Sequence, residues 1–205
     1  MIAVIDYGLG NLRSIAKALE YVGADVCVTN DKNKIKSADK LILPGVGAFG
    51  DGINNLKKLG IIPVLEEEVL AKKKPIWGIC LGMQLMAKKS EEFGFHDGLG
   101  WISAGVVSLA GGFNRRNLKI PHVGWNTVAF VREHPVISGL NKSEDFYFVH
   151  SFHAVPENPG LALGTCDYGG EFCACIANGN IFATQFHPEK SQGKGLKMLK
   201  NFVSM

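Results

Sequence analysis

Short apolar runs alternate with segments of helical periodicity through the first hundred or so residues. Residues 1–6 form an apolar run closed by the glycine-rich segment 7–10, and residues 11–21 then carry apolar side chains at helical spacing. The pattern continues with expected strands at residues 26–29, 41–43 and 76–79 and with expected helices at residues 56–71 and 81–88. Alternation of strands and helices predicts an α/β fold with a parallel sheet covered by helices on both faces.

The second half of the chain has shorter apolar segments punctuated by glycine. These segments predict strands joined by turns at residues 106–109, 127–131, 146–149 and 181–186, and a closing helix at residues 194–202. No linker, repeat or low-complexity stretch divides the chain. We therefore expect residues 1–205 to form a single α/β domain, with a mostly parallel central sheet and additional antiparallel strands.

Composition narrows the class of protein. Of the 205 residues, 46% are hydrophobic and 20% are charged, which is typical of a globular protein and does not favour a disordered or fibrous chain. The net charge of +3 is too small to indicate a nucleic-acid partner, and we interpret the basic run Lys72-Lys73-Lys74 as a solvated loop. No apolar run approaches the roughly 20 residues that cross a bilayer. The N-terminus also lacks the pattern of a cleavable leader, so we expect a cytoplasmic protein.

The cysteines do not form a disulfide framework. There are five of them, Cys27, Cys80, Cys166, Cys173 and Cys175, and they are too dispersed for such a framework in a chain of this length. The last three cluster in sequence, but they lack a C-x-x-C pair and a nearby histidine partner. We therefore expect reduced thiols, buried on strands, and no metal site.

The segment Gly78-Ile79-Cys80-Leu81-Gly82-Met83-Gln84 lies where an apolar strand is expected to meet a helix. In the cysteine form of a nucleophile elbow, flanking glycines allow a sharp turn that lifts the side chain out of the sheet. The N-terminus of the following helix favours the thiolate, which is the nucleophilic form of cysteine. A buried cysteine in a tight turn is the alternative interpretation of this segment alone.

A second reactive segment, Gln185-Phe186-His187-Pro188-Glu189-Lys190-Ser191, follows an apolar strand near the C-terminus. His187 can accept the thiol proton and return it to a leaving amine, and Glu189 can fix the orientation and tautomer of the imidazole. Pro188 restricts the backbone between them. Together with the elbow cysteine, this pattern predicts a catalytic triad of Cys80, His187 and Glu189 that needs no cofactor.

At these residues the sequence resembles the class I (triad) glutamine amidotransferases, and the resemblance covers the whole chain. It rests on segments 78–84 and 186–191. The resemblance implies a flavodoxin-like fold and a reaction in which Cys80 attacks the side-chain amide of glutamine. Ammonia is then released, and water hydrolyses the remaining glutamyl thioester. Residues implied to bind the substrate are Gly47, Gln84, His150 and Ser151.

The segment Pro44-Gly45-Val46-Gly47-Ala48-Phe49-Gly50 contains a G-x-G-x-x-G pattern after an expected strand. A dinucleotide site is one interpretation, but a proline precedes the pattern and it does not belong to the first strand-helix unit. In the family that the chain resembles, this loop supplies a backbone N–H of the oxyanion hole, which implies a hole formed at Val46 and Leu81. Many relatives have a Gly-Gly pair here, whereas Val46 separates the two glycines of this chain. We expect a loop that must rearrange before the glutaminase is fast.

Three further segments, 6–14, 120–126 and 146–151, resemble the glutaminase subunits of imidazole glycerol phosphate synthase, a subgroup of this family. The subgroup implies a heterodimer with a HisF-like (β/α)8-barrel synthase of histidine biosynthesis, through whose barrel ammonia reaches a phosphorylated ribulosyl intermediate. Residues that match the partner interface are Asn11, Trp125, Tyr147 and Lys190. Structural alternatives are a helix cap for Asn11, core positions for the two aromatics and a solvated side chain for Lys190.

Other functions stay open at this stage. A homologous glutaminase with a HisF-like partner supplies ammonia for surface-sugar amination, a cysteine hydrolase uses a similar elbow on peptides, and a non-catalytic binding subunit is disfavoured by the complete triad. His150 and His153 flank Ser151, but this spacing disfavours a Ser-His hydrolase and no elbow surrounds the serine. The remaining histidines, His96, His122 and His134, are expected to be structural or surface residues.

Overall fold

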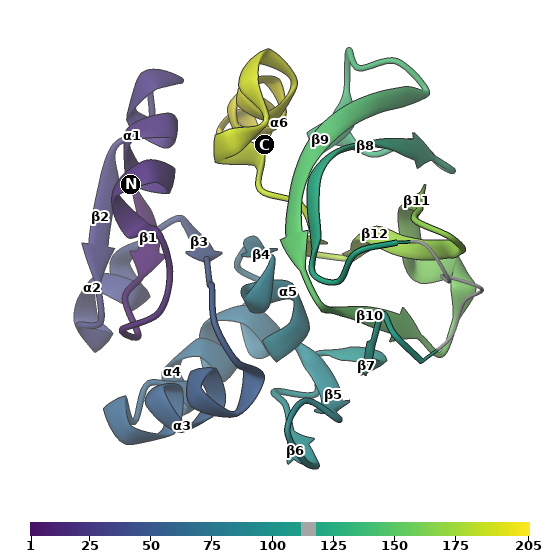
Figure 1. Cartoon of the computed structure of the whole chain (residues 1–205). Coiled ribbons are helices and arrows are strands. Elements are labelled where there is room, and N and C mark those ends of the chain that lie inside the picture. Colours follow the sequence, from purple (N-terminus) through teal and green to yellow (C-terminus); the bar gives the residue numbers. More distant parts are fainter. Residues whose placement is uncertain (112–117) are drawn as a thin grey trace.

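The computed structural model describes residues 1–111 and 118–205, in which the main sheet has nine strands in the order β2-β1-β3-β4-β13-β12-β11-β8-β9. The parallel strands are β1 (Ile2–Ile5), β2 (Val26–Thr29), β3 (Lys40–Leu43), β4 (Ile76–Ile79) and β13 (Ile181–Thr184). The strands that continue the sheet in antiparallel pairs are β8 (His122–Phe130), β9 (Ser143–His150), β11 (Ala162–Asp167) and β12 (Glu171–Asn178). Figure 1 shows the antiparallel strands curving away from the parallel half.

A second, four-stranded sheet packs on the same side of the main sheet as α3 and α4. Its order is β10-β7-β5-β6, with β5 (Ala87–Ser90), β6 (His96–Asp97), β7 (Ile102–Ser108) and β10 (Phe152–Pro156). Ile102 and Ala104 of β7 and Ala154 of β10 belong to the same buried cluster as the helices on that side of the main sheet. Ser151 alone connects the end of β9 to the start of β10, so the chain passes directly from the main sheet to the smaller one.

Helices cover both faces of the parallel half. On one face are α1 (Leu12–Tyr21) and α6 (Gln192–Ser204), and on the other are α2 (Lys32–Ser37), α3 (Phe49–Leu59) and α4 (Ile62–Glu66), which continues as a π-helix (Glu67–Ala71). Because strand side chains alternate, Ile2 and Val4 of β1 pack with Leu19 of α1, whereas Ala3 and Ile5 pack with Leu56 of α3. The predicted α/β fold, with helices on both faces and additional antiparallel strands, is confirmed.

Two predicted helices were wrong in their limits. The helix expected at residues 56–71 begins earlier, at Phe49, and stops at Leu59, because Gly60 adopts φ 60°, a left-handed conformation that ends helices. A new helix then starts at Ile62, with Pro63 in its first turn, where proline is well tolerated. The helix expected at residues 81–88 is also shorter. It is α5 (Leu81–Leu85), and the residues from Ala87 onward pair as β5 with β7.

The interpretation of the basic run as a solvated loop was wrong for Lys74. Its side chain is only 10% exposed, and its Nζ lies 2.7 Å from the buried carboxylate of Glu68. The same Nζ donates to the carbonyl oxygens of Ile35 and Lys36. Lys74 therefore ties α2 to the π-helix, while the neighbouring Lys73 is exposed.

No helix in the described parts of the chain is both long and apolar enough to cross a membrane. The clustered cysteines lie on β11 and β12, and burial raises the pKa of Cys166 and of Cys173 to about 12. Within residues 1–111 and 118–205, no three His, Cys, Asp or Glu side chains gather where they could hold a metal.

Candidate active site

Cys80 occupies a strained corner between β4 and α5. Its backbone has φ 53° and ψ −108°, a region that L-residues seldom adopt and that costs about 1–3 kcal/mol. The Cys80 N–H donates to the carbonyl oxygen of Thr184 on β13 at 2.7 Å, which holds the corner against the neighbouring strand. The geometry is that of the predicted nucleophile elbow.

Gly78 and Gly82, which flank Cys80, are needed for close packing of the backbone and not for an unusual backbone angle. A Cβ on Gly82 would lie 1.7 Å from the carbonyl oxygen of Leu43, and one on Gly78 would lie 2.9 Å from Sδ of Met86. The positive φ falls on Cys80 and on neither glycine. The sequence interpretation therefore had the right residues for a different physical reason, since the glycines let α5 sit directly against β3 and β4.

The predicted acid-base pair, His187 and Glu189, lies just beyond β13. Nδ1 of His187 is 2.8 Å from Oε1 of Glu189, and the two side chains are 2% and 4% exposed. The turn between them is a short 3-10 helix (Pro188–Lys190). The hydroxyl of Ser191 donates to the His187 carbonyl and accepts from the Tyr147 N–H, which ties this turn to β9. A hydrogen bond from Nδ1–H to a carboxylate leaves Nε2 as the basic nitrogen of a neutral imidazole.

The second imidazole nitrogen of His187 faces the thiol. This Nε2 is buried and makes no hydrogen bond of ordinary length with any residue that the structure describes. Burial alone would lower the pKa of His187, but the negative charge of the nearby Cys80 thiolate, with a further contribution from Glu189, raises it to about 10. The charged imidazole is therefore stabilised when the thiol gives up its proton, as an acid-base partner of a cysteine nucleophile requires.

A pocket of about 370 Å³ opens beside Cys80. Residues that were predicted for the oxyanion hole and for substrate binding all line it, namely Val46, Gly47, Leu81, Gln84, His150 and Ser151. Lys190 and Glu92 also line the pocket. The volume is at the small end of ligand pockets and suits a molecule of amino-acid size. The structure thus brings together side chains from the β3–α3 loop, the elbow, the β5–β6 turn and the β9–β10 connection.

Glu92 was missed by the sequence interpretation. Its Oε2 accepts from the Phe49 N–H at 2.7 Å, at the first turn of α3, and burial raises its pKa although this bond and His96 act in the opposite direction. No spacing rule links an acid on a turn to a pocket formed by distant loops. The contact also disfavours the dinucleotide interpretation of the 44–50 segment, because a carboxylate already occupies the helix N-terminus where a phosphate would bind.

His150 lines the pocket but is held in its own hydrogen-bonded array. Its Nε2 lies 2.9 Å from Nδ1 of the buried His122, and its Nδ1 lies 2.8 Å from the carbonyl oxygen of Phe152. His122 in turn contacts Oδ1 of Asn126. Both ring nitrogens of His150 thus lie within hydrogen-bond distance of groups other than Ser151, which disfavours a Ser-His hydrolase.

Three of the four residues expected at a partner interface form one continuous surface. Trp125 and Tyr147 face each other across β8 and β9 with ring centroids 6.1 Å apart, and Nζ of Lys190 lies 5.6 Å from the centre of the Tyr147 ring. Trp125 is 46% exposed, so a core position was wrong for it. Asn11 caps α1 by accepting from the Ser14 N–H, which is its structural alternative, and its side chain remains exposed.

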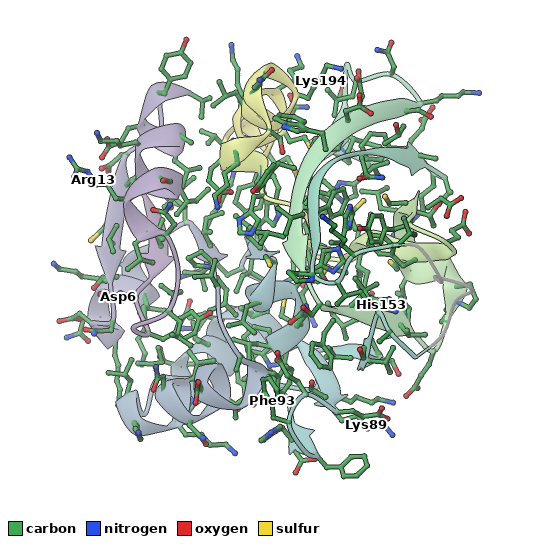
Figure 2. The ribbon with its side chains drawn as sticks, viewed as in Figure 1. Asp6, Arg13, Lys89, Phe93, His153 and Lys194 are labelled. Atoms are coloured by element: carbon green, nitrogen blue, oxygen red, sulfur yellow. The ribbon has the colours of Figure 1, made fainter. Side chains whose placement is uncertain are left out.

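A larger hollow of about 770 Å³ runs along residues 130–142, away from the thiol. Its histidine, His134, accepts from the Val136 N–H and stacks on Phe182 with ring centroids 5.5 Å apart. Those contacts give His134 a structural role, as expected. Figure 2 shows Arg13 at the edge of the molecule and His153 within its outline, where the His153 side chain is buried.

Comparison with known proteins places this geometry in context. A family model for Glutamine amidotransferase class-I matches residues 3–205. The chain is 48% identical over 206 residues to imidazole glycerol phosphate synthase subunit HisH 2 of Pseudomonas aeruginosa, covering 100% of both chains. It is 50% identical over 200 residues to subunit HisH of Aquifex aeolicus, covering 97% of this chain and 94% of that one. The structure of PurLQS from Thermotoga maritima is similar in fold, with a TM-score of 0.74 at 20% identity over 99% of this chain and 96% of that chain.

Proposed function

This chain belongs to the class-I glutamine amidotransferases, and within them to the HisH subunits of imidazole glycerol phosphate synthase, and from that membership we propose the function of its site. The chain is a glutaminase subunit that releases ammonia from glutamine for imidazole glycerol phosphate synthesis in histidine biosynthesis. Residues 1–205 act as one glutamine amidotransferase domain. The observation that carries the proposal is the buried His187–Glu189 pair facing an elbow cysteine beside a pocket of amino-acid size.

In the proposed reaction Cys80 Sγ attacks the side-chain carbonyl carbon of glutamine. His187 takes the thiol proton and returns it to the amide nitrogen, so that the C–N bond breaks and ammonia leaves. The remaining glutamyl thioester is attacked by a water molecule, whose proton passes to His187 and then to the departing sulfur. Glutamate and the free thiol result. Glu189 holds the imidazole in the tautomer that presents Nε2 to the sulfur throughout.

The negative oxygen of the tetrahedral intermediate needs donors fixed in advance. We propose the backbone N–H of Leu81, at the start of α5, and one from the loop at Val46. The remaining contacts hold the amino-acid end of the substrate, and the residues proposed for it are Gly47, Gln84, His150 and Ser151. Glu92 adds a carboxylate at the pocket, which is suited to the α-ammonium group of glutamine.

The proposed partner is a HisF-like (β/α)8-barrel synthase, which docks across Asn11, Trp125, Tyr147 and Lys190. An exposed tryptophan beside a tyrosine and a lysine has the composition of the energetic centre of an interface. Lys190 belongs both to this surface and to the pocket, so a docked partner lies next to the site where ammonia is formed. The names of the relatives favour this partner over one that aminates surface sugars.

Three measurements test the function. The chain is mixed with a HisF-like synthase, and glutamate release from glutamine, cleavage of peptides and formation of imidazole glycerol phosphate are followed. We expect glutamate and imidazole glycerol phosphate in equal amounts and no peptide cleavage. Peptide cleavage without glutamine hydrolysis would identify a peptidase instead, and binding of the synthase without hydrolysis would identify a non-catalytic subunit.

A further inference from the structure

A chain of buried hydrogen bonds ends on the sulfur of Cys80. Nε2 of Gln185 lies 3.6 Å from Sγ of Cys80, and the Oε1 atom of Gln185 lies 3.2 Å from Nε2 of Gln84. Nε2 of Gln84 also lies 2.9 Å from the carbonyl oxygen of Phe152. Gln185 is fully buried and Gln84 nearly so, so water competes little for these bonds.

The donor and the acceptor of each hydrogen bond in this series can be assigned by starting from the carbonyl oxygen of Phe152. A backbone carbonyl oxygen only accepts, so the amide group of Gln84 must turn its NH2 toward Phe152. The same NH2 then donates to the nearest atom of Gln185, which must be the oxygen. The NH2 of Gln185 is therefore the group that faces the sulfur. A carbonyl of the peptide backbone thus fixes the orientation of two side-chain amides in turn, which no single amide would reveal by itself.

We propose that Gln185 is a further catalytic residue, which donates a hydrogen bond to the Cys80 thiolate and is aimed at the sulfur by Gln84 and the Phe152 carbonyl. The inference rests on the proposed role of Cys80 as the nucleophile. It gives the residue before Phe186-His187 a chemical role distinct from that of the base, because Gln185 contacts the reacting atom without exchanging a proton with it.

The second contact of the sulfur acts in the opposite direction. The carbonyl oxygen of Val149 lies 3.8 Å from Sγ and accepts only, so it stabilises the thiol form. Gln185 can only donate at this position and therefore stabilises the thiolate. The sulfur thus sits between an acceptor suited to the protonated form and a donor suited to the ionised form. Removal of the Gln185 donor leaves the His187 imidazole to favour the thiolate, and it shifts the balance toward the unreactive thiol.

The test measures the ionisation of Cys80 directly. The rate of alkylation by iodoacetamide is followed against pH for the full chain, without glutamine, and a Cys80→Ser chain reports the background of the other four thiols. Gln185→Met keeps the length of the side chain and removes the donor. We expect the midpoint of its alkylation rate against pH to rise by about 0.5–1 pH unit. Below the midpoint, this rise corresponds to a roughly three- to tenfold smaller fraction of thiolate.

Two more variants test the orientation of the Gln185 amide and the effect of a negative charge beside the sulfur. Gln84→Met leaves the Gln185 amide without its anchor, and the midpoint should rise by less than in Gln185→Met. Gln185→Glu preserves the shape and the acceptor for Gln84 but places a carboxylate against the sulfur, so the midpoint should rise the most. If Gln185→Met does not fold, Gln84→Met decides the question, because its midpoint rises only if the Gln185 amide is aimed at the sulfur.

The matched control is Thr184→Val. Thr184 precedes Gln185 and its buried hydroxyl accepts from the Trp77 indole and donates to the Phe186 carbonyl, so the variant loses buried bonds without touching the sulfur. Its midpoint should equal that of the unaltered chain. An unmoved midpoint in the Gln185 variants, or an equal rise in Thr184→Val, overturns the proposal. A chain that alkylates as expected but does not hydrolyse glutamine would refute the proposed function and leave this inference standing.

Discussion

Nδ1 of His187 lies 2.8 Å from Oε1 of Glu189, two residues further along the chain, and both side chains are almost completely buried. The carboxylate cannot rotate away to water, so the imidazole has one orientation and one preferred tautomer. The proton acceptor and the group that orients it are therefore separate, and they should respond differently to mutation.

His187→Asn should lower glutamine hydrolysis by about 10²–10⁴-fold, because the proton acceptor is lost. Glu189→Gln should lower it less, since the imidazole remains and loses only its orientation and the nearby charge. Steady-state glutamate release measures both. His150→Asn is the control, since this ring lines the same pocket but its nitrogens contact His122 and the Phe152 carbonyl. A loss in His150→Asn as large as that in His187→Asn, with substrate binding intact, would show that the base has been misassigned.

Cys80→Ser should abolish glutamine-dependent turnover, because a serine hydroxyl at this corner is a far weaker nucleophile than a thiolate. Synthesis by the partner should persist when ammonium is supplied directly. The two rates are measured on the same complex. Glutamine hydrolysis at the unaltered rate would exclude Cys80 as the nucleophile, and loss of the ammonium-dependent rate would indicate a disrupted complex.

The free energy of unfolding should depend on pH in the way that the raised pKa of His187 predicts. Beside the ionised Cys80 its pKa rises from 6.5 to about 10 on folding, so His187 keeps its proton between these values in the folded chain. The stabilisation is complete below about pH 6.5 and is lost as the pH rises through 10, because the slope of the unfolding free energy is negative wherever the folded state binds more protons. Urea unfolding from pH 6 to 10 should show this decline, and His187→Asn should flatten it. Equal slopes for the two chains would contradict the pairing.

Lys74→Met should destabilise the fold by about 1–3 kcal/mol, because it leaves the buried Glu68 with Lys72 alone and frees two carbonyls of α2. Burial would raise the pKa of Glu68, but Lys72 and Lys74 outweigh it and lower the pKa below its usual 4.5. The difference in unfolding free energy between the variant and the unaltered chain should therefore decrease as the pH falls below about 4.5, where Glu68 takes up a proton. Lys73→Met, at an exposed position beside it, should change stability by at most about 0.5 kcal/mol.

The isolated chain should hydrolyse glutamine slowly and accelerate when a HisF-like barrel carrying its own ligand docks. The reason is the oxyanion loop, where Val46 separates the glycines and a donor not yet aimed at the developing charge costs about a hundredfold or more in rate. Activation requires the ligand to favour the competent loop, so the gain is limited by its differential affinity. Rates are compared for the chain alone, with the partner, and with the partner and its ligand. Three equal rates would rule out gating at this loop.

The sequence was most informative where chemistry imposes local rules. A strand that runs into Cys80 between glycines, and a histidine two residues before a glutamate, are patterns whose meaning does not depend on distant parts of the chain. The parallel half of the sheet followed from alternation alone. In contrast, α2 was missed, because its six residues, three of them lysines, bury only Ile35 and leave almost no apolar periodicity. The stop at Gly60 was missed because one left-handed residue ended an otherwise helical pattern.

The parts of the site that escaped prediction depend on tertiary contacts. Glu92 reaches the pocket because β5 and β6 turn back toward α3, and no local pattern reports that turn. The apolar spacing around Ala87 continues from α5 and predicts a helix, yet pairing with β7 decides its conformation. Gln185 belongs to the motif around His187, but the motif does not indicate its role. That role depends on the orientation of its amide, which the carbonyl oxygen of Phe152 sets through Gln84 from 33 residues earlier and from another sheet.

The insertion of β13 between β4 and β12 sets an order in time as well as in space. During synthesis, β1 to β4 and the corner at Cys80 emerge well before the ribosome has translated residues 181–189. Until then β4 has a bare edge, the Cys80 N–H lacks its bond to Thr184, and the sulfur has neither the base nor the amide that serves it. Such a long sequence separation makes closure of this pairing entropically costly and slow. A nascent or truncated chain that ends before residue 181 therefore has Cys80 but none of the groups that follow β13, and we expect it to release no ammonia.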